Sequence, residues 1–318
     1  MEVLIIGLSS IVKRRVLPAL QRIPEVQRID LATRKAADAS VRHDWTHGEV
    51  YSDYAEALKR TSAQAVYISL VNSAHEPWTE TALQHGFHVM VDKPGFLGYE
   101  RTARMVDIAA KQDRCLAEAT VFGYHPQIGV AFSLFADAGD APKRISMALS
   151  FPPMDDANFR YQANLGGGAL WDVGPYLVAT SRLFFGAEPV TVDCRVLSRR
   201  EGDLETAFTA LGTFPDGRSL AGQFGFDTAY LNRLSLVGDS MVLDIDRVFT
   251  TPPDYRSTIR VTGPKVQSLV EVPTADAFTC FFERVFGLIK AGDWESLTAD
   301  LLSDSRLLER YRNAAGSN

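Results

Sequence analysis

The sequence is poor in cysteine. Its three cysteines, Cys115, Cys194 and Cys280, are scattered over 318 residues and form no Cys-x-x-Cys pair. An odd and scattered set predicts neither a disulfide framework nor a zinc site, so we expect no metal. Thiols of this kind are typical of a reducing compartment, which makes the cytoplasm the expected location.

The sequence also lacks a basic excess and a long apolar run. Its 33 Lys and Arg residues are outnumbered by 39 Asp and Glu residues, giving a formal charge of −6. This balance argues against a nucleic-acid partner. No apolar stretch approaches the roughly 18 residues of a membrane span, so no membrane partner is expected. The opening MEVLIIGLSS has no basic region or cleavage site and is interpreted as a buried strand.

The composition that remains is that of a globular protein. Hydrophobic residues make up 46% and charged residues 23% of the chain, which is enough apolar material for a sizeable core. The length exceeds what one hydrophobic core usually supports. Two domains are therefore expected.

Residues 1–120 alternate apolar runs with helical patterns. The runs predict strands at Val3–Ile6, Arg28–Ala32, Val50–Ser52, Ala65–Val71, Phe87–Val91 and Cys115–Ala119. The segments between them predict helices at Tyr54–Arg60, Glu76–Gly86 and Tyr99–Lys111. Continuous apolar strands interleaved with helices indicate a parallel sheet covered on both faces. We predict an N-terminal doubly wound α/β domain of the Rossmann type.

Residues 121–318 have a different pattern, in which shorter segments alternate between apolar and polar residues. Strands are expected at Ile145–Phe151, Val190–Leu197, Thr206–Phe214, Ser219–Phe226 and Leu234–Leu243. This alternation predicts an open, mainly antiparallel sheet with helices on one face, in an α+β domain. An apolar stripe from Phe278 to Ile289 predicts a helix, and the last helix could return to the first domain.

The turn after the first strand is a candidate phosphate site. Dinucleotide-binding proteins have G-x-G-x-x-G/A here. Gly7 fills the first position, but Ser9 and Val12 fill the second and third, so the motif alone is weak. The helix N-terminus still favours a phosphate, and Ser9 and Ser10 could add hydroxyl donors. The alternative is the ordinary strand-turn-helix start of any α/β protein.

The end of the second strand bears on the choice of cofactor. NAD-specific proteins usually place an acidic residue here for the ribose 2′-hydroxyl. This chain has Thr33, followed by the cations Arg34 and Lys35. A hydroxyl and two cations suit a 2′-phosphate, which favours NADP(H) over NAD(H). The alternative is a solvated loop after a strand.

Three further segments carry chemistry. Asn72 and His75 follow the fourth strand, Asp92 and Lys93 follow the fifth, and a glycine-rich stretch leads to Tyr176. The first two lie where ligands bind an open α/β sheet, outside the carboxyl ends of its strands. Taken singly, each has a plain explanation: Lys93 as a surface cation, the glycines as a hairpin and Tyr176 as a core aromatic.

Together these motifs resemble the Gfo/Idh/MocA family of sugar oxidoreductases, typified by glucose–fructose oxidoreductase and inositol dehydrogenase. The resemblance spans essentially the whole chain. Besides the Rossmann start, it is carried by Asn72-x-x-His75, Asp92-Lys93-Pro94 for the usual Glu-Lys-Pro, Tyr124-His125-Pro126-Gln127, and Gly166-Gly167-Gly168-Ala169-Leu170-x-Asp172-x-Gly174. In that family the Lys-Pro lysine lies at the nicotinamide and substrate, and the glycine-rich stretch opens a helix carrying catalytic Asp and His.

The chain departs from that pattern at two positions. Tyr176 stands where most of the family has the catalytic His, and Ser9 replaces the central glycine. A Tyr here resembles the branch of nucleotide-sugar 3-ketoreductases, in which Lys and Tyr flank the reacting carbon. The segments Phe224–Asp227, Asn232–Arg233 and Arg247–Pro253 also look like that branch.

The resemblance implies a set of site residues. It implies that the cofactor is bound by Gly7, Ser9, Ser10, Ile11, Thr33, Arg34, Lys35, Leu70, Asn72, His75, Asp92 and Lys93. It implies that the substrate is bound by His75, Tyr124, His125, Trp171 and Asp172.

Chemistry alone suggests the roles of the candidate catalytic residues. A hydride that moves to a ketone leaves an alkoxide, which needs a proton donor within about 3 Å. Lys93 and Tyr176 are the expected acid/base pair, with their individual roles open, and a nearby Lys93 would lower the pKa of the Tyr176 phenol. Asp172 could orient Lys93 or bind a sugar hydroxyl. His75 is expected to contact the cofactor or sugar ring, and His125 either contacts substrate or caps a helix.

Three functions are compatible with these residues. The first is an NADP(H)-dependent oxidoreductase that reduces a 3-keto sugar linked to a nucleotide. The second is a dehydrogenase of a free sugar, cyclitol or dihydrodiol, since fold does not fix substrate. The third is a regulator that binds the dinucleotide without turnover.

The resemblance implies that the C-terminal domain binds substrate and that the chain self-associates, as a dimer or tetramer, through the open face of the C-terminal sheet. In that arrangement, aromatic residues of Thr206–Phe214 and Ser219–Phe226 cover one another across subunits. The alternative is that Phe208, Phe214, Phe224 and Phe226 pack under helices.

Overall fold

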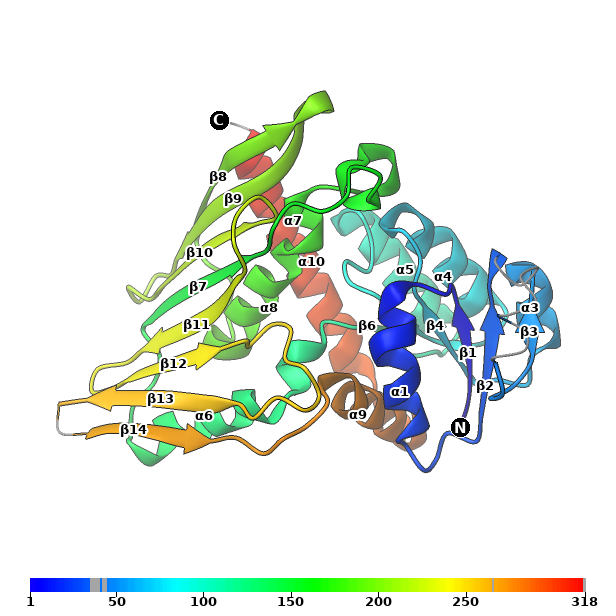
Figure 1. The fold of residues 1–318 in the computed structure, drawn as a ribbon, viewed down its shortest axis with the longest axis horizontal. Helices are drawn as coiled ribbons and strands as arrows, with labels where there is room; N and C mark the ends of the chain where they lie inside the picture. Colours follow the sequence, from blue (N-terminus) through cyan, green and yellow to red (C-terminus); the bar gives the residue numbers. More distant parts are fainter. Residues whose placement is uncertain (35–40, 42–44, 265, 317–318) are drawn as a thin grey trace. The chain divides into compact units, whose positions relative to one another are not determined.

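The computed structural model describes residues 1–34, 41, 45–264 and 266–316. The chain forms two compact units. Figure 1 colours the chain from its N-terminus in blue to its C-terminus in red. The first unit comprises Met1–Ala119 and Phe278–Leu302, and the second comprises Thr120–Ala277 and Ser303–Asn318. Each unit has its own sheet.

The sheet of the first unit is parallel, with the strand order β3-β2-β1-β4-β5-β6. Its strands are β1 (Glu2–Ile6), β2 (Arg28–Ala32), β3 (Val50–Tyr51), β4 (Ala65–Ile68), β5 (His88–Val91) and β6 (Leu116–Glu118). The order reverses between β1 and β4, and ligands bind outside the carboxyl ends of the strands at such a reversal. The predicted doubly wound Rossmann sheet is confirmed.

Helices pack on both faces of this sheet. They are η1 (Val12–Val16) continuing into α1 (Leu17–Gln21), α3 (Tyr54–Arg60), α4 (His75–Gln84), α5 (Tyr99–Lys111), α9 (Ala277–Ala291) and the start of α10 (Glu295–Gly316). On one face, Leu4 and Ile6 join a buried cluster with residues of α4 and α5. On the other face, the Tyr67 ring lies 5.4 Å from the Phe282 ring of α9. Two-sided burial explains why most residues of the central strands β1, β4 and β5 are apolar.

The sheet of the second unit is mainly antiparallel, with the order β14-β13-β12-β11-β7-β10-β9-β8. Its strands are β7 (Arg144–Ser150), β8 (Thr191–Arg200), β9 (Leu204–Thr213), β10 (Ser219–Gly225), β11 (Leu231–Val237), β12 (Val242–Asp246), β13 (Thr258–Gly263) and β14 (Val266–Glu271). One pair, β10 with β7, is parallel. The predicted fold class is confirmed.

One strand prediction in this sheet was wrong. The segment Leu234–Leu243 is not a single strand but parts of β11 and β12, which pair antiparallel around the turn at Gly238. The sequence contains the turn signal Val237-Gly238-Asp239, and it ends the first strand after Val237.

One face of this sheet packs against helices and encloses the core of the second unit. The helices are α6 (Pro126–Asp137), α7 (Ala169–Asp172), α8 (Gly174–Phe185) and the later part of α10. Ile145, Met147 and Leu149, at alternate positions of β7, belong to this core. It also buries the four aromatics considered for subunit contacts, so the packing alternative holds for Phe208, Phe214, Phe224 and Phe226.

Candidate active site

The turn after β1 requires glycine at position 7. Gly7 has φ +100°, and a Cβ built there would lie 2.1 Å from the carbonyl oxygen of Ser69. No other residue fits without moving the main chain of the strand end next to it. The turn then leads into η1, and the Ser9 Oγ accepts a hydrogen bond from the Val12 N–H at 3.1 Å. The end of β1 is thus held against the end of β4.

Asp92 follows β5 and accepts two hydroxyl hydrogen bonds. One comes from the Tyr67 phenol and the other from the Ser69 hydroxyl, one on each carboxylate oxygen. The Ser69 Oγ also lies 2.8 Å from the Ser9 Oγ. Burial, together with the Asp92 charge, raises the pKa of Tyr67 well above its ordinary value, so this phenol remains a donor.

Lys93 and the residues after it form a turn fixed by side chains from other elements. The Gly95 N–H donates to the Glu118 carboxylate at 2.7 Å, and the Pro94 carbonyl oxygen lies 2.9 Å from the His75 Nδ1. Lys93 itself is half-buried, and its peptide bond to Pro94 is cis. The main chain that carries the ammonium is therefore attached to β6 and to α4.

His75 is fully buried and bonded to main-chain carbonyls. Its other ring nitrogen, Nε2, lies 3.1 Å from the carbonyl oxygen of Leu70. Both ring nitrogens thus face the backbone of neighbouring loops. In this arrangement the ring connects the loop after β4 to the turn of Lys93.

The remaining cofactor candidates lie at the carboxyl ends of β1, β2 and β4. Thr33 is buried, and its N–H donates to the Tyr51 carbonyl oxygen at 2.9 Å. Arg34 is exposed, and its guanidinium lies 5.7 Å from the centre of the Tyr54 ring. Lys35 lies outside the described residues. Of the others, Ser10 is exposed, Ile11 and Leu70 are half-buried, and Asn72 is buried.

In the second unit, the glycine-rich stretch is held by the loop before it. The Gly168 N–H donates to the Arg160 carbonyl oxygen at 2.9 Å, and the Gly167 N–H donates to the Gln162 carbonyl oxygen at 3.0 Å. Gly168 has φ +108°, and a Cβ there would lie 2.5 Å from a carboxylate oxygen of Glu205. Glycine is therefore needed where the chain enters α7.

Asp172 and Trp171, at the end of α7, each contact an arginine. The Asp172 carboxylate lies 2.8 Å from the Arg160 Nε, and the side chain of Asp172 is 7% exposed. The Arg312 guanidinium lies 3.9 Å from the centre of the half-buried Trp171 ring. Arg160 balances the charge of Asp172 inside the second unit.

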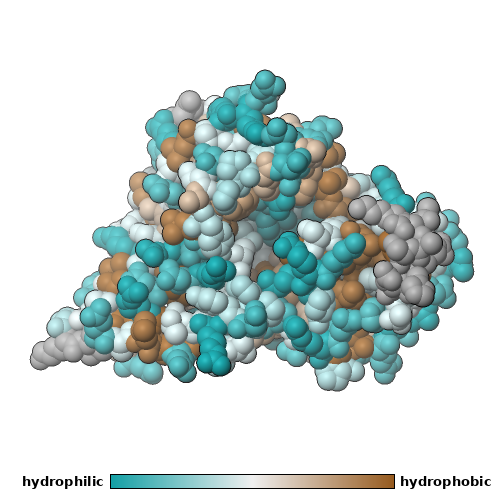
Figure 2. Space-filling model, viewed as in Figure 1, coloured by the Kyte–Doolittle hydropathy of each residue, from teal (hydrophilic) through white to brown (hydrophobic). Residues whose placement is uncertain are grey.

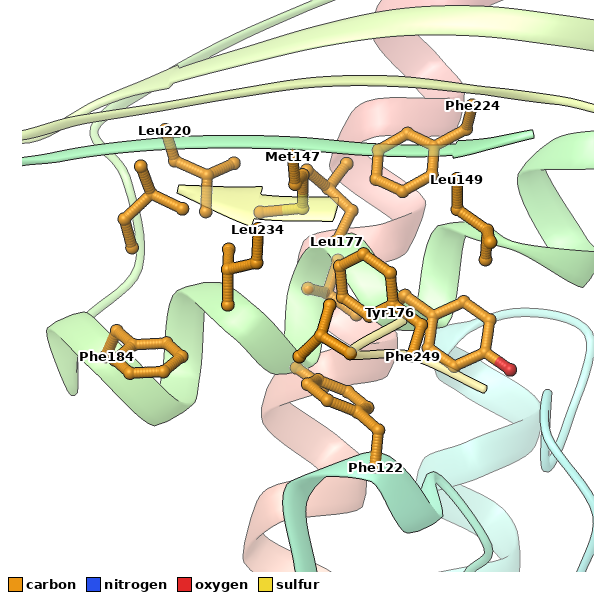
Figure 3. Close-up of a cluster of buried hydrophobic side chains, with 14 of the residues drawn as sticks. Phe122, Met147, Leu149, Tyr176, Leu177, Phe184, Leu220, Phe224, Leu234 and Phe249 are labelled. Atoms are coloured by element: carbon orange, nitrogen blue, oxygen red, sulfur yellow. The ribbon is translucent and has the colours of Figure 1, made fainter. Parts of the chain in front are cut away.

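Tyr176, near the start of α8, packs its ring into the core of the second unit. The ring is 5.8 Å from that of Phe122 and 5.3 Å from that of Phe249. Figure 3 shows the phenol oxygen at the edge of this cluster, directed away from the apolar side chains. The aromatic packing fixes the orientation of the ring and with it the position of the phenol oxygen.

His125 and Tyr124 precede α6. The His125 Nδ1 accepts a hydrogen bond from the Gln127 N–H at 3.3 Å, so the ring caps α6. His125 is buried and Tyr124 is half-buried. Capping was one of the two roles that the sequence left open for His125.

Four contacting residues were absent from the sequence-based site. Ser69 interrupts the apolar run Ala65–Val71, and Glu118 ends a buried strand, so each left a signal. Tyr67 resembles an ordinary core aromatic. Arg160 gave no signal, because its partner Asp172 lies twelve positions away in a different element.

Two observations on the described residues concern membranes and metals. None of the described helices combines the length and apolar character that crossing a membrane requires. Within the described ranges, no three His, Cys, Asp or Glu side chains gather as a metal site would need.

Comparison with known proteins decides the family. Residues 1–120 match the GFO/IDH/MocA model described as "Oxidoreductase family, NAD-binding Rossmann fold", and residues 141–243 match the GFO/IDH/MocA C-terminal domain. The chain is 30% identical over 317 residues to the dTDP-3,4-didehydro-2,6-dideoxy-alpha-D-glucose 3-reductase of Actinomadura kijaniata, covering 98% of this chain and 94% of that protein. The chain belongs to the GFO/IDH/MocA oxidoreductase family.

Other GFO/IDH/MocA relatives extend this comparison. D-xylose 1-dehydrogenase (NADP(+)) 2 of Haloferax volcanii is 30% identical, covering 70% of this chain and 69% of that protein. Among solved structures, KijD10, a 3-ketoreductase from Actinomadura kijaniata in complex with NADP and TDP-benzene, superposes with a TM-score of 0.93 at 28% identity. That match covers 99% of this chain and 98% of KijD10. Variants of KijD10 with a tyrosine changed to phenylalanine, or a lysine changed to alanine or glutamate, have been solved with the same ligands.

Proposed function

We propose that this protein reduces the 3-keto group of a sugar carried on a nucleoside diphosphate, with NADPH as the hydride donor. The observation that carries the proposal is the similarity, over nearly the whole chain, to a dTDP-sugar 3-reductase and to KijD10 with NADP and TDP-benzene. Membership of an oxidoreductase family agrees with this chemistry.

The first unit has groups that suit NADP(H). Gly7 brings the main chain close to the end of β4 and opens the helix that follows, where a pyrophosphate is favoured. At the end of β2, Thr33 stands in the position of the usual acidic residue, and Arg34 is exposed beside it. An arginine can grip a 2′-phosphate with two hydrogen bonds. When bound, NADPH supplies the hydride.

Lys93 and Tyr176 are the proposed acid/base pair. Reduction of a ketone leaves an alkoxide, which both a Lys ammonium and a Tyr phenol can protonate. Lys93 comes from the first unit and Tyr176 from the second. The fixed main chain around Lys93 and the aromatic packing of Tyr176 support a preorganised site. The lysine and tyrosine replaced in KijD10 are residues of the same types.

Asp172 is proposed to bind a sugar hydroxyl or to orient Lys93. Its carboxylate is held at the end of α7 by Arg160. A carboxylate can accept several hydrogen bonds, including ones from sugar hydroxyls. Tyr124, His125 and Trp171 are proposed to line the sugar site, and His75 supports the turn that carries Lys93.

A second candidate function is the oxidation of a free sugar with NADP(+). It is favoured by the similarity to a D-xylose 1-dehydrogenase over 70% of the chain. The two functions differ in whether the substrate carries a nucleotide. Adding dTDP as an inhibitor distinguishes them, because a nucleotide-sugar site should bind dTDP and a free-sugar site should not.

The test is NADPH oxidation with a panel of substrates. Purified protein is mixed with NADPH and either 3-keto dTDP-sugars or free keto sugars, and the loss of nicotinamide absorbance is followed. We expect turnover with the nucleotide-linked substrates and none in the Lys93→Met, Tyr176→Phe double variant. Full turnover in that variant would contradict the assignment, and turnover confined to free sugars would favour the second function.

The uncovered face of the second unit's sheet is proposed as the contact between copies of this chain, forming a dimer or tetramer. Its side chains include exposed Leu197, Leu211 and Leu269, with exposed fractions of 58%, 44% and 64%. In Figure 2 the surface over β12–β14 mixes hydrophobic and hydrophilic side chains. Sedimentation of the wild type and a Leu211→Lys variant tests this proposal: a monomeric wild type would refute it.

We also propose a cytoplasmic location. Cys115, Cys194 and Cys280 are all free thiols, none of them paired in a disulfide. Such thiols suit a reducing compartment. Fractionation of cells expressing the tagged protein checks this, and recovery outside the cytoplasm would contradict it.

A further inference from the structure

A hydrogen-bond chain crosses the carboxyl ends of three neighbouring strands in the first unit. It begins at Ser9, in the turn after β1, and passes to Ser69 at the end of β4 through an Oγ–Oγ contact of 2.8 Å. It continues from the Ser69 hydroxyl to Asp92 after β5. Tyr67 donates to the other oxygen of Asp92 and closes the chain.

The donors and acceptors of this chain have one consistent direction. The carboxylate of Asp92 accepts, so the Ser69 hydrogen is used in that bond. In the 2.8 Å contact Ser69 must therefore accept, and Ser9 must donate. The Ser9 oxygen meanwhile accepts from the Val12 N–H.

This direction changes the role expected for Ser9. Because its single hydroxyl hydrogen points to Ser69, it cannot also be donated to a cofactor phosphate. The Ser9 side chain, which stands in place of the usual second glycine, instead donates its hydrogen bond to Ser69 within the protein. Its hydroxyl connects the dinucleotide turn to the residue before Lys93.

Burial makes the chain costly to break. Tyr67 is fully buried and Ser69 is 2% exposed, whereas Ser9 and Asp92 are half-buried, so water cannot readily replace a partner lost at Tyr67 or Ser69. Removing one hydroxyl would leave a neighbouring donor or acceptor unsatisfied in a low-dielectric site. The chain is thus expected to keep a single arrangement.

The same chain holds one side of the Lys93 turn. Asp92 precedes Lys93, while His75 and Glu118 hold Pro94 and Gly95, the two residues that follow it. The main chain at Lys93 is therefore fixed from both directions. A shift of the reacting ammonium by about 1 Å is enough to lower a rate by about a hundredfold.

We propose that Ser69 and Asp92 are positioning residues, which fix Lys93 relative to the dinucleotide turn through Ser9. The proposal rests on the function proposed above, in which Lys93 acts at the substrate carbonyl. It assigns a use to Ser69, and it gives the serine at position 9 a role that a glycine could not fill.

The test compares variants that break the chain with variants that keep it. Ser69→Ala removes the central hydroxyl, Asp92→Asn removes one acceptor, and Asp92→Glu retains a carboxylate. Thr79→Val is the matched control, because Thr79 is a buried residue of α4 whose hydroxyl has no hydrogen-bond partner in the described structure. For each variant, NADPH Kd is measured by fluorescence, kcat and KM by NADPH oxidation, and Tm by calorimetry.

We expect Ser69→Ala and Asp92→Asn each to lower kcat by about tenfold or more, with a smaller change in the sugar KM. Ser69→Ala should also raise NADPH Kd severalfold, because it releases the Ser9 turn. Asp92→Glu should recover most of kcat, and Thr79→Val should change none of these constants. The Ser69→Ala, Asp92→Asn double variant should be little worse than either single variant, because both interrupt one chain.

Three results would overturn the proposal. The first is a Ser69→Ala enzyme with kcat and NADPH Kd within twofold of wild type. The second is a fall in Tm with kcat unchanged, which would make the chain purely structural. The third is full additivity in the double variant. If the wild type reduces no keto sugar, the proposed function fails instead. The NADPH Kd values of the Ser9→Ala and Asp92→Asn variants and of their double variant then test the coupling of the two loops, and additive effects on Kd would show that the loops are not coupled.

Discussion

Substituting Gly7 with alanine tests how closely the first turn approaches β4. The new Cβ would lie 2.1 Å from the Ser69 carbonyl oxygen, at a backbone φ of +100°. The positive φ costs about 1–2 kcal/mol for a residue with a Cβ. Overpacking against a main chain that cannot rotate away adds about 1–3 kcal/mol. We therefore expect Gly7→Ala to lower the free energy of unfolding by about 2–5 kcal/mol.

Two other glycines separate these contributions. Gly186 has φ +59°, and a Cβ at this position would meet nothing within 4 Å, so Gly186→Ala reports the backbone cost alone. Gly129 lies in α6, also with nothing within 4 Å, so Gly129→Ala should be neutral or stabilising by up to about 1 kcal/mol.

Calorimetric Tm and NADPH fluorescence titration are the assays for this series. Each kcal/mol should move Tm by about 2–4 °C in a unit of this size. Gly7→Ala should also weaken NADPH binding, because it displaces the turn and separates Ser9 from Ser69. The reasoning is refuted if Gly7→Ala lowers Tm no more than Gly186→Ala does.

Three further predictions concern individual side chains. Arg34→Ala should raise the Kd of NADPH by about tenfold or more and leave the Kd of NADH unchanged. Equal effects on the two Kd values would exclude a contact between Arg34 and the 2′-phosphate. Arg160→Met should lower the free energy of unfolding by about 1–3 kcal/mol, because it removes the cation beside the buried Asp172 carboxylate. Arg160→Lys should lower it less, and equal Tm values for the two variants would contradict this. Burial, and to a smaller extent the Arg114 cation, lower the pKa of His88 from its ordinary 6.5. The unfolded chain therefore binds the proton first as the pH falls, so the free energy of unfolding should be at its full value above pH 6.5 and should decrease as the pH drops toward the lowered pKa. In a His88→Gln variant, denaturation curves across this range should lose that dependence.

Local signals predicted much of the first sheet. The helix Tyr54–Arg60 was predicted with its observed bounds, because Asp53 caps it by accepting from the Glu56 N–H at 2.8 Å. The strand predicted for Ala65–Val71 ends earlier, at Ile68. The Ser69 N–H still donates to the Ile6 carbonyl oxygen, and its hydroxyl donates to Asp92, a contact that depends on how β4 and β5 pair.

The second sheet was less visible in the sequence. The strands β13 and β14 were not predicted, because their segments are short and largely polar on the outer face. The apolar residues of β13 become recognisable as core only once β12 lies beside them, with Ile259 opposite Ile245.

The candidate site divides in the same way. Candidates such as Lys93 and Tyr176 could be named from the motifs that carry the family resemblance. Their supports could not, because Glu118 and Arg160 reach their partners from elements that are distant in the sequence. The sequence predicts the candidate catalytic side chains, whereas the tertiary fold determines which residues contact and position them.

The central claim is that the protein delivers a hydride from NADPH to a sugar carbonyl, with Lys93 and Tyr176 supplying the proton. Its most direct test is a single turnover with NADPH carrying deuterium at the transferred position, followed by NMR of the product. We predict deuterium at C3 of a dTDP-linked sugar in the wild type, and at least a hundredfold slower transfer in the Lys93→Met, Tyr176→Phe variant. Bound NADPH whose deuterium reaches no sugar, or a double variant that transfers it at the wild-type rate, would contradict the claim.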